Sequence, residues 1–100
     1  MATEISWTDE AIETFNKKYW VSARWVVRKE VAKFIQQTLH ILERLKKFPL
    51  SYPAGLKNKK YRRARLNKYI ALFYRYYKSK DEIVLITFWN VKQDPNKLKY

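Results

Sequence analysis

The sequence contains no cysteine, one glycine and three prolines among its 100 residues. Without cysteine, a disulfide framework, a thiolate zinc site and a cysteine nucleophile are excluded. Because glycine and proline are so rare, long flexible linkers are disfavoured and regular elements should dominate. No apolar run reaches the ~18–20 residues of a membrane span, and the start lacks the basic-then-apolar order of a signal peptide. We therefore expect a cytoplasmic protein with no membrane partner.

Negative charge is missing from one long stretch of the chain, between Arg44 and Lys80. The net charge of the whole chain is +13. A local field of one sign favours a polyanionic or acidic partner. The alternative is that the charge only keeps an aromatic-rich domain in solution. The basic residues of the stretch are Arg44, Lys46, Lys47, Lys57, Lys59, Lys60, Arg62, Arg63, Arg65, Lys68, Arg75, Lys78 and Lys80.

Apolar side chains, by contrast, are abundant. Hydrophobic residues make up 47 % of the chain and aromatic residues 17 %, which is far too rich for a disordered protein. One hundred residues is the size of a single domain, and no internal repeat is present. We therefore expect residues 1–100 to form one domain with its own core.

The first half of the chain predicts a strand and two helices. Residues 4–8 alternate as a short strand does, and Thr8 is a candidate helix N-cap before two acidic residues. We expect a turn near Trp25–Arg28 and a second helix that Pro49 ends. The predicted apolar stripes are Ile12, Phe15, Tyr19 and Ala23 in the first helix, and Val31, Phe34, Ile35, Thr38, Leu39, Ile41, Leu42, Leu45 and Phe48 in the second.

The second half predicts three strands, over residues 61–66, 69–77 and 83–91. Short polar turns separate them, which favours antiparallel pairing of neighbours. With the elements before them, these strands predict an α+β fold. In that fold, the N-terminal strand and a two-helix hairpin pack on one face of a small antiparallel β-sheet.

Alternation in residues 69–77 separates two rows of side chains. We expect Ile70, Leu72, Tyr74 and Tyr76 to face the helices, because this row contains the aliphatic residues. Tyr69, Phe73, Arg75 and Tyr77 should then point outward, beside Arg63 and Arg65 of the preceding strand. Exposed aromatic rings beside arginines are typical of binding surfaces, since nucleic-acid bases stack on them. The alternative is an edge strand whose charges prevent aggregation.

Templates for catalysis and metal binding mostly fail. The single histidine, His40, falls on the polar side of a predicted helix, and the sequence offers no histidine–carboxylate pair, metal-ligand cluster or phosphate-binding glycine loop. We expect no cofactor and no metal. A catalytic version of this protein would rely on cations. RNA cleavage by 2′-hydroxyl attack fits that condition, because its transition state concentrates negative charge on the phosphate.

Four segments together resemble the RelE/ParE superfamily of toxins from bacterial type II toxin–antitoxin systems. They are ISWTDEAIETF, LERLKKFP, YIALFYRY and ITFWNVKQDPNKL, of which the last is the most specific. The resemblance covers nearly the whole chain and implies the fold given above. It also implies a cytoplasmic toxin that a cognate antitoxin neutralises through an acidic or amphipathic segment. RelE-like members are ribosome-dependent endoribonucleases that cut messenger RNA, whereas ParE-like members inhibit DNA gyrase without being enzymes.

The resemblance and the outward row together suggest site residues. The chain departs from the nuclease pattern at Ala71 and Asn90, where such enzymes often have an arginine and a histidine. Three functions therefore stay open: a ribosome-dependent mRNA endoribonuclease, a gyrase inhibitor, and a degenerate nucleic-acid-binding module. The candidate catalytic residues are Arg65, Arg75 and Tyr100, and the candidates for binding nucleic acid or another target are Lys57, Lys60, Arg62, Arg63, Tyr69, Phe73 and Lys92.

Overall fold

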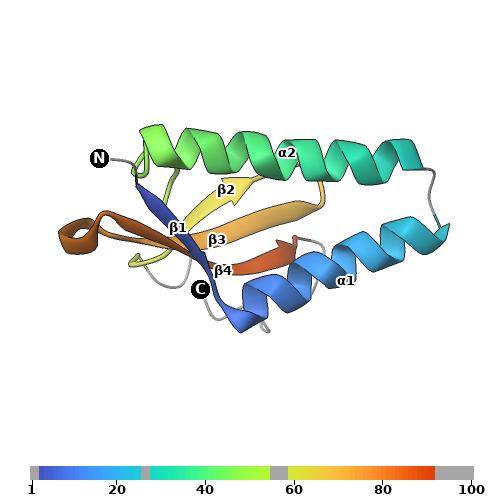
Figure 1. Ribbon diagram of the computed structural model, residues 1–100, viewed down its shortest axis with the longest axis horizontal. Helices are drawn as coiled ribbons and strands as arrows, with labels where there is room; N and C mark the ends of the chain where they lie inside the picture. Colours follow the sequence, from blue (N-terminus) through green and yellow to red (C-terminus); the bar gives the residue numbers. More distant parts are fainter. Residues whose placement is uncertain (1–2, 26–27, 55–58, 92–100) are drawn as a thin grey trace.

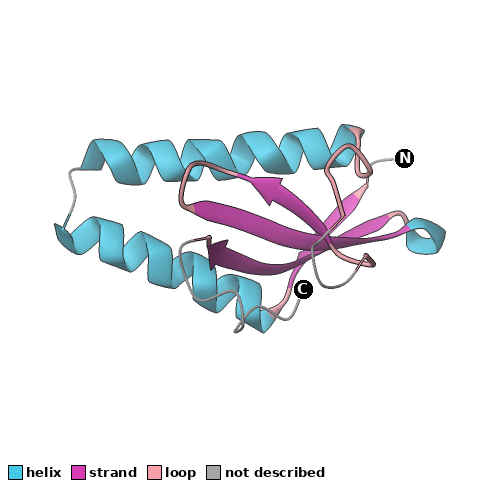
Figure 2. Ribbon diagram, turned by 180° about the vertical axis from the view of Figure 1, so that it is seen from behind, coloured by secondary structure: helices cyan, strands magenta, loops and turns pink. Residues whose placement is uncertain are grey.

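The computed structural model describes residues 3–25, 28–54 and 59–91, with helix side chains described up to Lys17 and from Ala32 onward. The elements are β1 (Glu4–Trp7), α1 (Asp9–Trp25), α2 (Arg28–Lys47), β2 (Arg62–Arg65), β3 (Ile70–Tyr77), a short 3-10 turn (Lys78–Lys80) and β4 (Glu82–Asn90). Each strand lies within one residue of its predicted bounds, and the helices meet where the turn was expected. Figure 1 shows α1 and α2 as an antiparallel pair, and Figure 2 shows the molecule from behind. None of the described helices is both long and apolar enough to cross a membrane.

The four strands form one sheet in the order β1-β4-β3-β2. β2, β3 and β4 pair antiparallel with their neighbours, as the short turns predicted. β1 instead lies parallel to β4, with Glu4 opposite Glu82 and Trp7 opposite Leu85. Parallel pairing needs a long connection, and the helical hairpin lies between β1 and the other strands. The predicted fold class is therefore confirmed, with a mixed sheet in place of a purely antiparallel one.

Thr8 begins α1 and fixes it against the edge of β4. Its Oγ1 accepts a hydrogen bond from the Ala11 N–H at 3.0 Å, which confirms Thr8 as the N-cap. The same hydroxyl donates to the Leu85 carbonyl oxygen at 2.9 Å. Further along, the Phe88 N–H donates to Thr14 Oγ1 at 3.0 Å. Because β1 ends at Trp7, these bonds satisfy backbone groups of β4 that no strand pairs with at that edge.

The main core lies between the helices and one face of the sheet. Ile70, Leu72 and Tyr74 are buried in it and Tyr76 packs against it, which confirms the predicted helix-facing row of β3. Aromatic rings fill the end near α1, where Phe15 lies 5.3 Å from Phe34 between ring centroids. The other buried members of this core are Ala11, Phe34, Ile41, Leu45, Ala64, Leu66, Ile83, Leu85 and Phe88.

Three described members of the predicted helical stripes are exposed. Ile12, Leu39 and Phe48 are 44 %, 57 % and 61 % exposed. Among the described side chains of α1, Ala11 is buried and Phe15 packs against the core, so the first turn buries Ala11 in place of the predicted Ile12. Residues three or four positions apart both lie on one face of a helix, so the sequence pattern alone did not decide whether Ala11 or Ile12 is buried. The side chains of Tyr19, Ala23 and Val31 lie outside the described ones.

The opposite face of the sheet carries a second, smaller cluster. Ala71 and Phe73 are buried there against the partly buried Ile86, Trp89 and Val91. Only 1 % of Phe73 is exposed. Phe73 therefore faces away from the helices, as predicted, but the expectation that its ring is exposed there for binding is wrong. The helix-free face contains apolar packing of its own, so its aromatic residues do not all reach solvent.

A β-bulge in β4 supplies part of that packing. Phe73 lies opposite Thr87, whereas the next residue of β3 lies opposite Leu85, so Ile86 is the extra residue. A bulge breaks the strict alternation of side chains along a strand. Here it lets Ile86 join the second cluster while Phe88, two residues later, returns to the main core.

Candidate functional site

The helix-free face of the sheet is the candidate site, because the register places Arg63, Arg65 and Arg75 on it. Arg63 lies opposite Phe73, and Arg65 lies opposite Ala71. Arg75 follows Phe73 by two residues and therefore points to the same side. Diagonal neighbours on a sheet are only ~7–8 Å apart, so Arg63 and Arg75 can act on one polyanion together. The expected sharing of a face by these arginines holds.

Arg65 is engaged with the turn between β2 and β3. Its Nε donates to the carbonyl oxygen of Asn67 at 3.2 Å, and its Nη2 donates to that of Lys68 at 3.1 Å. Asn67 completes the turn, because its Oδ1 accepts the backbone N–H groups of Tyr69 and Ile70 at 2.8 and 3.0 Å. The exposed guanidinium of Arg65 thus holds its own turn, and an anion would compete with two carbonyl oxygens for it.

Arg75 lies over an aromatic ring near the far end of β3. Its Cζ is 4.5 Å from the centroid of the Tyr77 ring, and both side chains are partly buried. A guanidinium over the face of a ring is attracted by the negative charge density there. This contact fixes the direction in which Arg75 can offer its donors.

Arg62 lies on the other face of β2, in the row of Ala64, and holds a loop. Its Nη1 donates to the carbonyl oxygen of Tyr52 at 2.7 Å. The backbone adds a bridge between Ala54 and Arg62 and a hydrogen bond from the Arg63 N–H to the Pro53 carbonyl at 2.9 Å. The loop before β2 therefore covers the first half of this edge strand, and Arg62 fixes that cover.

The remaining predicted residues divide into two groups. Lys60 and Tyr69 are exposed, Tyr69 at 51 %, so both are accessible to a partner. Lys57, Lys92 and Tyr100 lie outside the described residues.

The two departures from the nuclease pattern lie on different faces of the sheet. Ala71 is opposite Trp89 and is completely buried. Asn90 is opposite Ile70, which belongs to the row that faces the helices. Because side chains alternate along a strand, Ala71 and Asn90 do not belong to one constellation on the helix-free face.

Two tyrosines that the sequence reasoning did not select organise the loop before β2. The buried Tyr74 donates its O–H to the Pro49 carbonyl at 2.8 Å. Burial raises the pKa of Tyr74 to about 12, although the nearby Arg62 acts in the opposite direction. The Tyr52 ring meets the Tyr74 ring edge-on, with centroids 6.3 Å apart. The sequence contained one sign of this role, namely that Tyr52 lies between Pro49 and Pro53 in the predicted loop.

Two acidic side chains, Asp81 and Glu82, lie where β3 ends and β4 begins. Asp81 Oδ1 accepts hydrogen bonds from Thr3 Oγ1 at 3.0 Å and from the Tyr76 O–H at 2.9 Å. The bond to Asp81 raises the pKa of Tyr76, because it stabilises the protonated hydroxyl beside a carboxylate. Glu82 Oε2 accepts a hydrogen bond from Ser6 Oγ at 2.8 Å. Through these bonds the two acids link the β1 segment to the hairpin of β3 and β4. They do not lie on β2, whose arginines make its edge of the sheet cationic.

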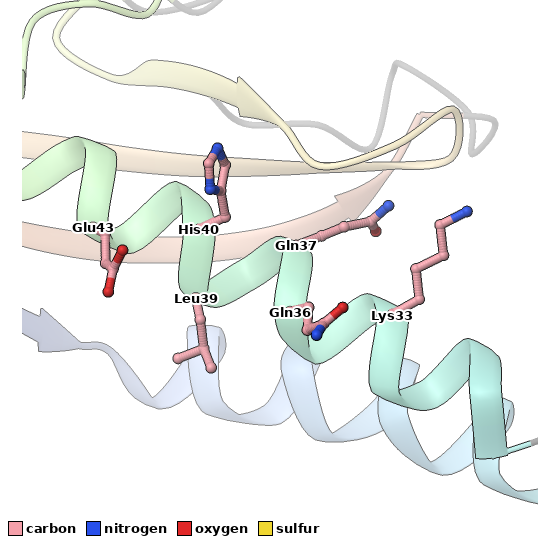
Figure 3. A pocket seen from close by; sticks show the side chains of 6 residues that line it. All are labelled: Lys33, Gln36, Gln37, Leu39, His40 and Glu43. Carbon is pink, nitrogen blue, oxygen red and sulfur yellow. The ribbon is translucent and has the colours of Figure 1, made fainter.

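An open hollow lies along α2 (Figure 3). Its six lining residues all come from this one helix: Lys33, Gln36, Gln37, Leu39, His40 and Glu43. His40 is exposed, as the helical pattern indicated. Gln37 is engaged elsewhere, because its Oε1 accepts a hydrogen bond from Asn67 Nδ2 at 3.1 Å. Within the described ranges, no three histidine or carboxylate side chains are grouped in a way that could hold a metal ion.

Comparison with known proteins gives matches in fold alone. No protein-family model and no curated protein matches the sequence. A chain of the chromosomal ParDE toxin–antitoxin system from P. aeruginosa matches with a TM-score of 0.73 at 14 % identity, over 90 % of this chain and 97 % of that chain. A YoeB/ParE toxin from Agrobacterium tumefaciens matches with a TM-score of 0.65 at 15 % identity, over 87 % and 96 %. A chain of the RelBE2 toxin–antitoxin complex from Mycobacterium tuberculosis matches with a TM-score of 0.61 at 15 % identity, over 90 % and 99 %. The chain therefore has the fold of these proteins along nearly all of its length.

Proposed function

We propose that this chain is the toxin of a type II toxin–antitoxin system of the RelE/ParE kind. The observation that carries the proposal is a fold shared over 87–90 % of the chain with solved proteins whose descriptions name such systems. The cationic β2 edge and the arginines of the helix-free face add to it, because a toxin of this kind acts on an assembly rich in nucleic acid.

The partner that follows from this proposal is a cognate antitoxin with an acidic or amphipathic segment. Carboxylates of that segment would cover Arg63 and Arg75, and its apolar side chains would cover the partly buried Trp89 and Ile86. Binding should weaken with added salt, but only in part, because the apolar contacts are not screened.

Expression alone tests the toxin proposal. We expect growth arrest when the chain is produced by itself, and relief of the arrest when the small gene adjacent to it is expressed as well. Unimpaired growth at a confirmed level of folded protein would leave the third function, a degenerate nucleic-acid-binding module.

The first candidate activity is ribosome-dependent cleavage of messenger RNA. It is favoured by the shared face of Arg63, Arg65 and Arg75, since cations there would stabilise charge on a phosphate in the transition state. Arg65→Ala and Arg75→Ala should then abolish translation arrest while the protein stays folded. Lys33→Ala, an exposed cation on α2, is the matched control. Unchanged toxicity in both arginine variants would rule out this mechanism.

The second candidate activity is inhibition of DNA gyrase without catalysis. It is favoured by the buried Ala71 in place of an accessible arginine, and by the guanidinium of Arg65, which is bound to turn carbonyls. A supercoiling assay with purified gyrase separates the two activities. We expect inhibition at micromolar toxin if this reading holds, and the absence of inhibition at any workable concentration removes it.

A further inference from the structure

Two arginines from separate elements meet at Tyr52, and we call these three residues the seam. Arg44, in the last turn of α2, places its Cζ 5.7 Å from the centroid of the Tyr52 ring. Arg62, at the start of β2, binds the Tyr52 carbonyl oxygen at 2.7 Å. The seam thus joins the end of α2 to the edge of the sheet, away from the helix-free face.

The position of Tyr52 is fixed by its neighbours rather than by its own loop alone. The loop is held before Tyr52 by the bond from Tyr74 to Pro49, and after it by the bond from the Arg63 N–H to Pro53. The Tyr74 ring also supports the Tyr52 ring from its edge. A ring held at so many points offers a stable base for the guanidinium that lies over it.

The surroundings of the seam are cationic. Lys46 and Lys47 share the last turn of α2 with Arg44, and Lys59 and Lys60 lie three and two residues before β2; all are exposed. The negative end of the helix dipole accounts for some positive charge in this turn. It does not account for a ring placed under one of the cations. The nearest acid along α2, Glu43, lines the hollow shown in Figure 3.

An exposed guanidinium with an aromatic ring beneath it has a specific chemistry. Its plane can stack with a base, and its edge can donate two parallel hydrogen bonds to a phosphate. An acidic peptide would use the charge and the hydrogen-bonding edge, because a carboxylate also accepts two parallel bonds. A single-stranded nucleic acid would use the plane as well. We propose that the seam binds single-stranded nucleic acid, at a place separate from the arginines of the helix-free face. This site goes beyond the proposed function and does not depend on which target the toxin has.

The test compares Arg44→Gln with Lys33→Gln in the whole chain. Both variants remove one exposed cation from α2, but Lys33 lies eleven residues earlier, roughly 16 Å along the helix. That separation exceeds the screening length of about 10 Å at 0.1 M salt, so the control should not sense a phosphate held at the seam. The probe is a fluorescently labelled single-stranded oligonucleotide of mixed sequence, and its affinity is measured over a range of salt concentrations.

We expect Arg44→Gln to weaken binding about tenfold, and to lower the slope of log affinity against log salt by about 0.7, the value for one phosphate contact in a single strand. Lys33→Gln should keep the wild-type slope. Equal losses in the two variants would overturn the proposal, because they would show an effect of net charge alone. Polyglutamate that competes as well as an unlabelled oligonucleotide of the same charge would also overturn it, since the plane would then contribute nothing. Neither outcome touches the growth test of the toxin proposal.

Discussion

Tyr74→Phe should lower the stability of the protein at neutral pH and make that stability less sensitive to alkali. At neutral pH the variant loses the O–H that donates to the Pro49 carbonyl oxygen at 2.8 Å. Tyr74 is fully buried, whereas Pro49 is only partly buried. Leaving a buried acceptor without its partner costs about 1–3 kcal/mol, so the partly buried carbonyl should place the loss toward the lower end of that range.

The alkaline part follows from the pKa of Tyr74, which burial raises to about 12 from the ordinary 10.0. Between these two values, the folded protein holds the hydroxyl proton while the unfolded chain releases it. The folded state then binds more protons, so the free energy of unfolding falls as pH rises. A shift of about two pKa units corresponds to roughly 2–3 kcal/mol, which is present below about pH 10 and lost by about pH 12. Phenylalanine has no proton to release, so the variant lacks this loss.

The assay is urea unfolding followed by circular dichroism, from about pH 8 to about pH 11.5. The stability curves of the wild type and Tyr74→Phe should converge as pH rises. Tyr69→Phe, which changes an exposed ring, is the matched control and should run parallel to the wild type. Parallel curves for Tyr74→Phe as well would show that burial of this hydroxyl does not govern the alkaline loss.

Four further substitutions test the packing and the roles of the arginines. Phe73→Ala should lower the free energy of unfolding by about 3–5 kcal/mol in a denaturant titration, and an unchanged value would contradict the buried second cluster. Ala71→Arg should lower the melting temperature without creating nuclease activity, because it forces a charge into a fully buried position. Thr8→Ala should cost about 0.5–2 kcal/mol through loss of the N-cap, whereas Thr8→Ser should restore most of it. Arg62→Ala should cost about 1–3 kcal/mol, but Arg63→Ala should stay within about 0.5 kcal/mol of the wild type, and equal costs would refute the separation of their roles.

The order and bounds of the elements could be predicted because local signals mark them. Pro49 ends α2, polar turns separate the last three strands, and Thr8 supplies the cap that begins α1. The helix-facing row of β3 could be predicted as well, since Ile70 and Leu72 are more aliphatic than their alternates. The parallel pairing of β1 with β4 left no such signal, because it joins residues about eighty positions apart.

Burial on the helix-free face could not be predicted from alternation. Alternation assigns a side chain to a face of the sheet, but it does not say what else lies on that face. Phe73 was assigned correctly, yet it is covered by a cluster that needs the extra residue Ile86 in β4. A bulge of this kind is defined by the pairing of two strands, so the sequence of either strand alone does not indicate it.

The arginines of β2 show why charge in a sequence does not by itself identify a site. Protection of an edge strand and binding of a partner were alternatives for the whole strand, and two of its three arginines have a structural contact that supports the edge. Arg62 and Arg65 donate to carbonyl oxygens of the loop and the turn that adjoin β2, so part of their charge maintains the edge. Arg63 lies between them on the helix-free face, opposite Phe73, and makes no side-chain hydrogen bond in the described part of the chain. Replacing Arg63 should therefore change the free energy of unfolding little. Of the three arginines of β2, it is the one whose replacement should most clearly affect binding without affecting stability.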